Sequence, residues 1–135
     1  MPFDLVLHGA HVIDSANGID EPRDVAIQDG RIAAVDKAIP VEGSRQAIDV
    51  TGLYLTPGLV DIHVHLYATA GNPDAWAGDN SVLPDGFSFR AGTTTMVDTG
   101  SAGFRNFPDF RNRVLERFST RTYAFVNIAG LGMMT

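Results

Sequence analysis

The chain has 135 residues, 44% hydrophobic and 19% charged, so it can build a sizeable core and is not an intrinsically disordered sequence. Its formal net charge is -6 and its 10 basic residues are scattered, which argues against nucleic acid or an anionic membrane as partner. Because cysteine is absent, disulfides and thiolate metal sites are excluded, and a metal would need histidine, carboxylate or modified side chains.

Targeting signals are not evident in the sequence. The N-terminus carries Asp4 and lacks a basic stretch followed by an apolar run, so it does not have the pattern of a signal peptide. No apolar stretch approaches the ~20 residues that cross a bilayer. We therefore expect a soluble, cytoplasmic protein with no membrane partner.

The first part of the chain, up to residue 56, predicts short strands and turns. Asp29-Gly30 lies between two apolar runs and predicts a tight hairpin, because both residues tolerate positive φ. Thr51-Gly52 separates residues 47–50 from 53–55 in the same way and predicts a second hairpin. Together these patterns predict a small antiparallel β layer.

The pattern changes after Thr56-Pro57-Gly58. The expected elements are a strand at 59–66, an irregular loop at 67–90, a strand at 93–97, a helix at 106–118 and a strand at 122–128. Strand, helix and strand form a βαβ unit, which implies an α/β fold with a parallel sheet. A sheet of so few strands has open apolar edges, and we therefore expect the chain to be truncated. Such edges also allow homo-oligomers to form.

The helix at 106–118 is predicted from its first turn and its apolar stripe. Asn106 suits the N-cap, Pro108 the first turn, and Asp109 the positive end of the helix dipole. The stripe consists of Phe107, Phe110, Val114, Leu115 and Phe118. These side chains are expected to form core.

The strand at 59–66 alternates strictly between apolar and polar residues. One face carries Val60, Ile62, Val64 and Leu66, and the other carries Asp61, His63 and His65. In a (β/α)8 barrel the apolar face packs on helices, and the polar face points inward near the catalytic end. His63 and His65 are two residues apart on one face, so their Cα atoms lie ~7 Å apart. At that separation both imidazole rings can bind one ion. The alternative is a half-exposed strand with two solvated histidines.

Residues 56–65, Thr-Pro-Gly-Leu-Val-Asp-Ile-His-Val-His, resemble the first barrel strand of the amidohydrolase superfamily. Residues 29–32, Asp-Gly-Arg-Ile, resemble the early hairpin of the small β-sandwich that precedes this barrel. The resemblance implies that residues 1–56 are the N-terminal part of that sandwich. Residues 57–135 would then be the first strands and helix of an incomplete metal-dependent hydrolase (β/α)8 TIM-like barrel.

A second set of segments resembles the deacetylase-like subgroup, which includes enzymes that act on N-acyl or O-acyl carboxylic acids. These segments are Asp85-Gly86-Phe87, Ala91-Gly92-Thr93-Thr94-Thr95-Met96-Val97-Asp98-Thr99-Gly100-Ser101-Ala102-Gly103, Asn106-Phe107 and Phe110-Arg111. The resemblance implies a metal-dependent hydrolase that cleaves an amide or ester bond of a small acylated substrate. It also implies one or two divalent ions, usually Zn2+, with His63 and His65 as metal ligands.

The remaining ligands of such a site, a lysine, two later histidines and a late aspartate, have no counterpart in this sequence. Lys37, His8 and His11 all lie in the front β region and are not expected to bind metal. A catalytic zinc normally takes three protein ligands, so the isolated chain is expected to lack activity. The catalytic acid or base is not assigned.

Other interpretations remain open at this point. Dihydroorotases usually carry an arginine two residues after the second histidine, where this chain has Tyr67, although hydantoinase-like relatives also lack it. A cyclic amidohydrolase, a non-catalytic β-rich interaction or self-association module, and a metal-independent pseudoenzyme are the alternatives. Asp98 with residues 99–103 is either a substrate-contacting loop or a tight strand-to-helix turn.

Overall fold

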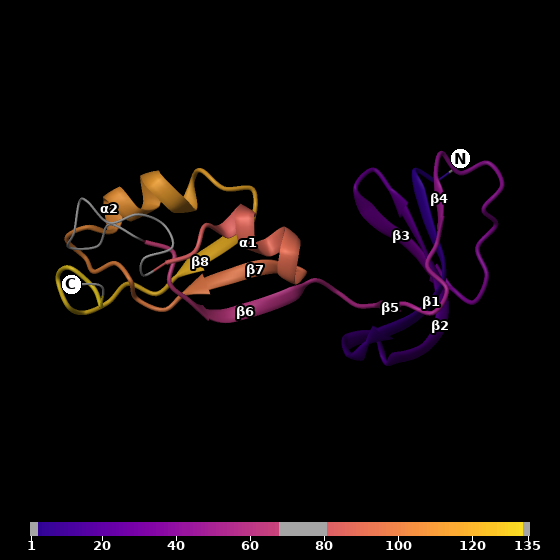
Figure 1. Cartoon of the computed structure of the whole chain (residues 1–135), viewed down its shortest axis with the longest axis horizontal. Coiled ribbons are helices and arrows are strands. Elements are labelled where there is room, and N and C mark those ends of the chain that lie inside the picture. The colour runs from indigo at the N-terminus through magenta and orange to yellow at the C-terminus, as the bar shows by residue number, and fades with distance from the viewer. Residues whose placement is uncertain (1–2, 68–80, 134–135) are drawn as a thin grey trace. The chain divides into compact units, whose positions relative to one another are not determined.

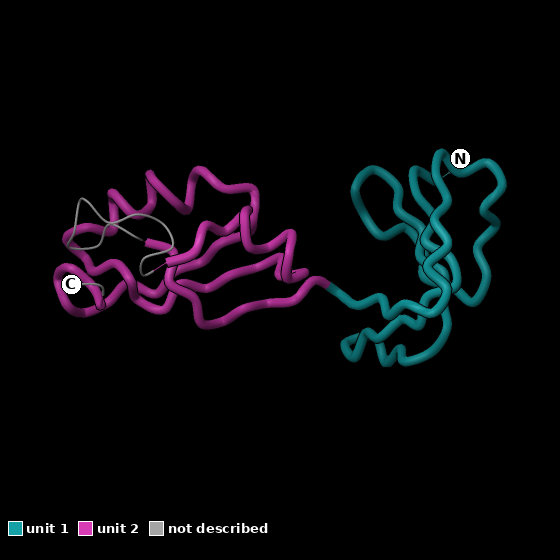
Figure 2. Tube along the Cα trace, in the orientation of Figure 1, with its two compact units in different colours: residues 1–57 teal, residues 58–135 magenta. Residues whose placement is uncertain are grey.

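The computed structural model describes residues 3–67 and 81–133. The chain divides into two compact units, Met1–Pro57 and Gly58–Thr135 (Figure 2). Within the described ranges, no helix combines the length and the apolar character needed to pass through a membrane.

Unit 1 is a five-stranded sheet with the order β3-β2-β1-β4, in which β5 also pairs with β1 (Figure 1). Its elements are β1 (Leu5–Asp14), the 3-10 turn η1 (Ser15–Asn17), β2 (Ile19–Gln28), β3 (Arg31–Asp36), β4 (Ala47–Asp49) and β5 (Tyr54–Leu55). Strand β2 is antiparallel to both of its neighbours, β1 and β3. The buried apolar side chains of the unit are Val6, Ala10, Val12, Val25, Ala26 and Ile39.

The hairpin predicted at Asp29-Gly30 is confirmed. Asp29 has φ 52° and Gly30 has φ 69°, so both central residues of the turn are left-handed. The strands on either side pair antiparallel, with Gln28 opposite Arg31. Two residues with positive φ match the twist of a two-residue hairpin, which explains why this turn was predictable.

The second predicted hairpin, at 47–55, is wrong. Strands β4 and β5 do not pair with each other but both run parallel to β1, so the layer is mixed rather than wholly antiparallel. The connection follows β1, because Val50 N donates to His8 O at 2.9 Å and His11 N donates to Leu53 O at 3.0 Å. Backbone groups on both sides of the turn are thus satisfied by the longer central strand.

Unit 2 is a three-stranded parallel sheet with the order β6-β7-β8, which confirms the predicted βαβ unit (Figure 1). Its elements are β6 (Leu59–Val64), α1 (Pro84–Ala91), β7 (Thr93–Asp98), α2 (Phe107–Phe110), the π-helical turn η2 (Arg111–Leu115) and β8 (Arg121–Ala124). The core joins the sheet to α2 and η2 through Val64, Leu66, Tyr67, Met96, Ala102, Phe110 and Val114. Strand β8 ends at Ala124, earlier than the predicted 128.

The predicted helix at 106–118 is shorter and less regular than expected. It ends at Leu115, and its second part is π-helical, with Glu116 N donating to Arg111 O at 3.0 Å. The wider turn lets the neighbouring residues Val114 and Leu115 both pack against the core. Asn106 makes no side-chain cap bond to the helix, because its Oδ1 accepts from Gly103 N at 2.8 Å.

The irregular loop predicted at 67–90 contains helix α1, which the sequence pattern did not indicate. Pro84 begins the helix and Gly92, with φ 68°, ends it in the left-handed conformation. Both residues are favoured at these helix ends, but Pro84 followed by Asp85-Gly86 is also typical of a loop. The part of the predicted loop at 68–80 lies outside the described residues.

The apolar face of β6 is only partly covered. Val64 and Leu66 are 8% and 3% exposed, whereas Val60 and Ile62 are 58% and 71% exposed, contrary to the expectation that all four pack on helices. Among the described residues, Phe110 of α2 and Val114 of η2 join the core at the carboxyl half of the strand. The histidine-bearing end of β6 is therefore its well-packed end.

Candidate metal centre

His63 and His65 lie at the carboxyl end of β6, with Val64 buried between them. Their ring centroids are 5.7 Å apart and the ring planes cross at 82°. His63 is exposed, and its backbone N–H donates to Asp61 Oδ1 at 3.0 Å. His65 is half-buried. Strand alternation thus brings two imidazoles together on the face opposite the core, as the sequence predicts.

His65 has a specific partner from the turn that follows the neighbouring strand β7. Its Nδ1 lies 2.9 Å from Oγ of Ser101, which is fully buried at 0% exposure. Ser101 belongs to the turn after β7, so the contact joins residues 36 positions apart. No pattern in the sequence indicates this pair, because only the parallel pairing of β6 with β7 brings the two residues together.

Asp98, the last residue of β7, is fully buried with 0% exposure. Its Oδ2 accepts from Leu66 N at 2.8 Å. Its Oδ1 accepts from Gly100 N at 3.0 Å and Ser101 N at 2.7 Å. A buried carboxylate needs such donors, and these three fix the turn after β7 against the end of β6.

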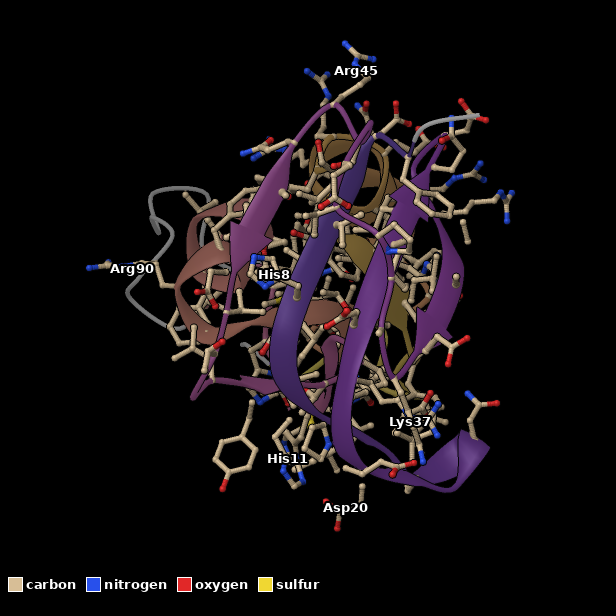
Figure 3. The ribbon with its side chains drawn as sticks, turned by 90° about the vertical axis from the view of Figure 1, so that its right-hand side faces the viewer. His8, His11, Asp20, Lys37, Arg45 and Arg90 are labelled. Carbon is tan, nitrogen blue, oxygen red and sulfur yellow. The ribbon has the colours of Figure 1, made fainter. Side chains whose placement is uncertain are left out.

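The other histidines and the single lysine are distributed over unit 1 (Figure 3). Nε2 of His11 lies 2.6 Å from Asp20 Oδ1, and its ring contacts Tyr54 with centroids 5.4 Å apart. His8 lies opposite Asp49 in the β1–β4 pair, and its charge contributes to lowering the pKa of Asp49, after two larger hydrogen-bond effects from Thr51. Each unit 1 histidine therefore has a neighbour inside its own sheet.

The donor set near His63 and His65 fits a divalent metal only in part. Imidazole nitrogens are good zinc ligands. Within 3–67 and 81–133, however, no cluster of three or more histidine and carboxylate side chains could hold an ion. The described residues thus offer a two-histidine part of a site.

Comparison with known proteins gives sequence relatives over most of the chain, although no family model matches it. It is 39% identical to a deacetylase of Agrobacterium fabrum over 108 residues, which cover 78% of this chain and 24% of the relative. It is 39% identical to a dihydroorotase of Elusimicrobium minutum over 132 residues, 96% of this chain and 29% of the relative. The chain thus spans 24% and 29% of the length of these two relatives.

Solved structures agree in fold. A dihydroorotase crystal structure superposes with a TM-score of 0.77 at 31% identity, covering 97% of this chain and 32% of that protein. An N-acyl-D-glutamate deacylase from Bordetella bronchiseptica, solved with zinc and a phosphonate inhibitor, shares the fold, with a TM-score of 0.64 at 20% identity over 96% of this chain and 30% of its own. The chain therefore belongs to the amidohydrolase superfamily and matches the N-terminal part of its members.

Proposed function

We propose that this chain supplies the first metal-binding strand of a metal-dependent hydrolase that cleaves amide or ester bonds of small acylated carboxylic acids. The observation that carries the proposal is the His63–His65 pair, with ring centroids 5.7 Å apart on the polar face of a barrel-type strand. The relationship to a deacetylase over 78% of the chain supports the reaction class.

His63 and His65 would hold a divalent ion, for which zinc is the first candidate because borderline-soft imidazole ligands suit it. Such an ion polarises a carbonyl and activates water for attack at neutral pH. The residues of this chain contribute binding and orientation: Val64 anchors the strand in the core, so the imidazoles on either side face away from it. No residue within 3–67 and 81–133 is assigned as the proton-transferring group.

The 135-residue chain alone is expected to be inactive. A catalytic zinc takes three protein ligands, and the described residues provide two imidazoles at this position. Measurable hydrolysis of an N-acetyl amino acid by the purified chain would contradict this expectation.

The proposal is tested on the protein expressed from its full natural reading frame, with zinc content and hydrolysis of N-acetyl and O-acetyl carboxylic acids as readouts. His63→Ala and His65→Ala should each lower the zinc content, and each should lower hydrolysis by more than the about 10–100-fold loss typical of groups outside the ligand shell. His8→Ala is the matched control, because it removes an imidazole from β1 in unit 1. Equal zinc content in the wild type and both ligand variants would reject the proposal.

A cyclic amidohydrolase is the second candidate function. It is favoured by the 39% identity to a dihydroorotase over 96% of the chain. Against dihydroorotase itself stands Tyr67, at the position of that subgroup's usual arginine, since this residue is 3% exposed and belongs to the core. Dihydroorotate and hydantoin in the same substrate panel distinguish the two functions.

A further inference from the structure

The environment of His65 differs from that of His63. His63 is exposed, whereas His65 is half-buried and holds Nδ1 2.9 Å from the Ser101 hydroxyl. An imidazole that binds metal through one nitrogen usually donates its other N–H to an oxygen, which fixes both ring orientation and tautomer. Ser101 Oγ occupies that position, so Nε2 is the nitrogen of His65 left for a ligand.

Ser101 is itself held in place. Its side chain is fully buried, and its backbone N–H donates to Asp98 Oδ1 at 2.7 Å. The same carboxylate accepts from the N–H of Leu66, the residue after His65, at 2.8 Å. The buried Asp98 carboxylate therefore fixes the backbone of Ser101 and the backbone next to His65.

A further backbone hydrogen bond holds the residue on the other side of His65. Thr99 N donates to Val64 O at 3.1 Å, so the residue before His65 is also tied to the turn after β7. Gly100, between Thr99 and Ser101, has φ 89° and permits the tight turn that brings Ser101 back towards β6. A turn that only reversed the chain would not need to bury a hydroxyl against an imidazole.

We propose that Ser101, held by Asp98, is a positioning residue: its hydroxyl accepts the Nδ1–H of His65 and keeps Nε2 free to bind metal. The inference rests on the proposed metal-binding function of His63 and His65. It predicts an unequal pair, in which His65 is preorganised and His63 adjusts when the ion binds. Ser101 touches no reacting group in this arrangement and acts through His65 alone.

The first test needs no metal. Long-range 1H–15N spectra of the chain labelled with 15N-histidine, recorded where imidazole is neutral, report which nitrogen of His65 carries the proton. The wild type should show the Nδ1–H tautomer. Ser101→Ala should show a mixture, and Ser101→Thr, which keeps the hydroxyl, should restore the wild-type pattern.

Controls separate a positioning role from a structural one. His63→Ala removes the neighbouring imidazole and should leave the His65 tautomer unchanged. Asp98→Asn, which replaces one acceptor oxygen by a donor, should move the tautomer in the same direction as Ser101→Ala. A wild-type His65 protonated at Nε2, or a tautomer unaltered in Ser101→Ala, overturns the proposal.

Zinc titration of the wild type and the same variants, each expressed from the full natural reading frame, forms the second test. Ser101→Ala should weaken zinc binding about 10–100-fold, and Ser101→Thr should recover most of it. Unchanged affinity in Ser101→Ala would overturn the positioning role. If zinc leaves the wild-type His63 and His65 signals unshifted, the proposed function fails, and the metal-free tautomer spectra still decide whether Ser101 sets the state of His65.

Discussion

At the residue scale, side chains beside the site serve packing as well as chemistry. Tyr67, two residues after His65, places its ring against Phe110 with centroids 5.1 Å apart and donates its hydroxyl to Asp109 Oδ2 at 2.5 Å. Asp109 also accepts from Arg113 Nε at 2.9 Å. Tyr67 thus links the end of β6 to the helix that covers it.

Tyr67→Phe should lower the free energy of unfolding by about 1–3 kcal/mol, because it leaves the ring in place and removes the hydrogen bond to Asp109. Tyr123→Phe is the control, since Tyr123 is 57% exposed and should change stability by less than about 0.5 kcal/mol. Urea unfolding followed by circular dichroism measures both. Equal stability of the two variants would show that the hydroxyl does not contribute.

Asp85 connects α1 to the segment before β8. Its carboxylate accepts from Ser119 N at 3.0 Å, Thr120 N at 2.7 Å and Thr120 Oγ1 at 2.7 Å. The Ser119 backbone bond, followed by those from Thr120, lowers the pKa of Asp85 below its ordinary 3.8. The ionised form is therefore the one that the fold favours.

This depressed pKa gives a pH dependence of defined sign. The stabilisation from Asp85 is fully present above 3.8, the value in the unfolded chain, and disappears as the pH falls through the lower folded-state pKa. Asp85→Asn should be less stable than the wild type at pH 7 and should converge with it in acid. Thermal unfolding from pH 7 to pH 2 measures the difference, and parallel curves for the two proteins would contradict the assignment.

At the element scale, the turn after β7 and the segment after β8 lie in close contact. Gly103 pairs with Asn127 in an isolated parallel bridge, and a Cβ at Gly103 would overlap the Ala129 carbonyl oxygen and the Gly130 backbone. Asn127 Nδ2 donates to Gly100 O at 3.2 Å. Two segments without regular structure thus continue the β7–β8 alignment past the strand ends.

Gly103→Ala should therefore destabilise unit 2 by about 1–3 kcal/mol or more, because backbone atoms must shift to admit the methyl group. Gly86→Ala provides a matched control in α1, where the nearest atom to an added Cβ is Leu83 Cβ at 3.9 Å. That variant should gain roughly 0.5–1 kcal/mol from helix propensity. Chemical denaturation of both variants tests the contrast, and a neutral Gly103→Ala would argue against the close approach.

Sequence patterns predicted the elements whose causes are local. Asp29-Gly30 makes its own turn, and alternation alone places His63 and His65 on one face. The pairing within the segment at 47–55 was predicted wrongly. Its turn is local, with Gly52 at φ 81°, but the strands on either side of the turn both pair with β1, which is distant in the sequence. Ser101 was missed for the same physical reason, since its contact forms only when β6 and β7 pair.

At the scale of the whole molecule, the sheet of unit 2 has exposed apolar side chains on both edge strands and their extensions. On β6, Val60 and Ile62 are 58% and 71% exposed, and beyond β8, Phe125 and Ile128 are 66% and 97% exposed. Large exposed apolar patches and open strand edges favour association. We therefore expect the 135-residue chain, studied alone, to self-associate.

The double substitution Ile62→Lys with Phe125→Lys should shift the 135-residue chain towards monomer, because it places charge on both apolar edges. The control is Ala16→Lys, which adds a charge on the exposed turn η1 of unit 1. Light scattering coupled to size-exclusion chromatography over a concentration series measures the state of each protein. A wild-type chain that stays monomeric throughout would contradict the expectation.

The buried carboxylate of Asp98 has a consequence for how the site is assembled in time. Its bonds from Gly100 N and Ser101 N lie within the turn after β7, whereas its bond from Leu66 N comes from the end of β6 and forms only when the two strands have paired. Folding of this strand pair and organisation of the candidate metal ligand His65 are then one cooperative event. The free energy that protects the amide of Leu66 from hydrogen exchange is also the free energy that keeps the ligand in place.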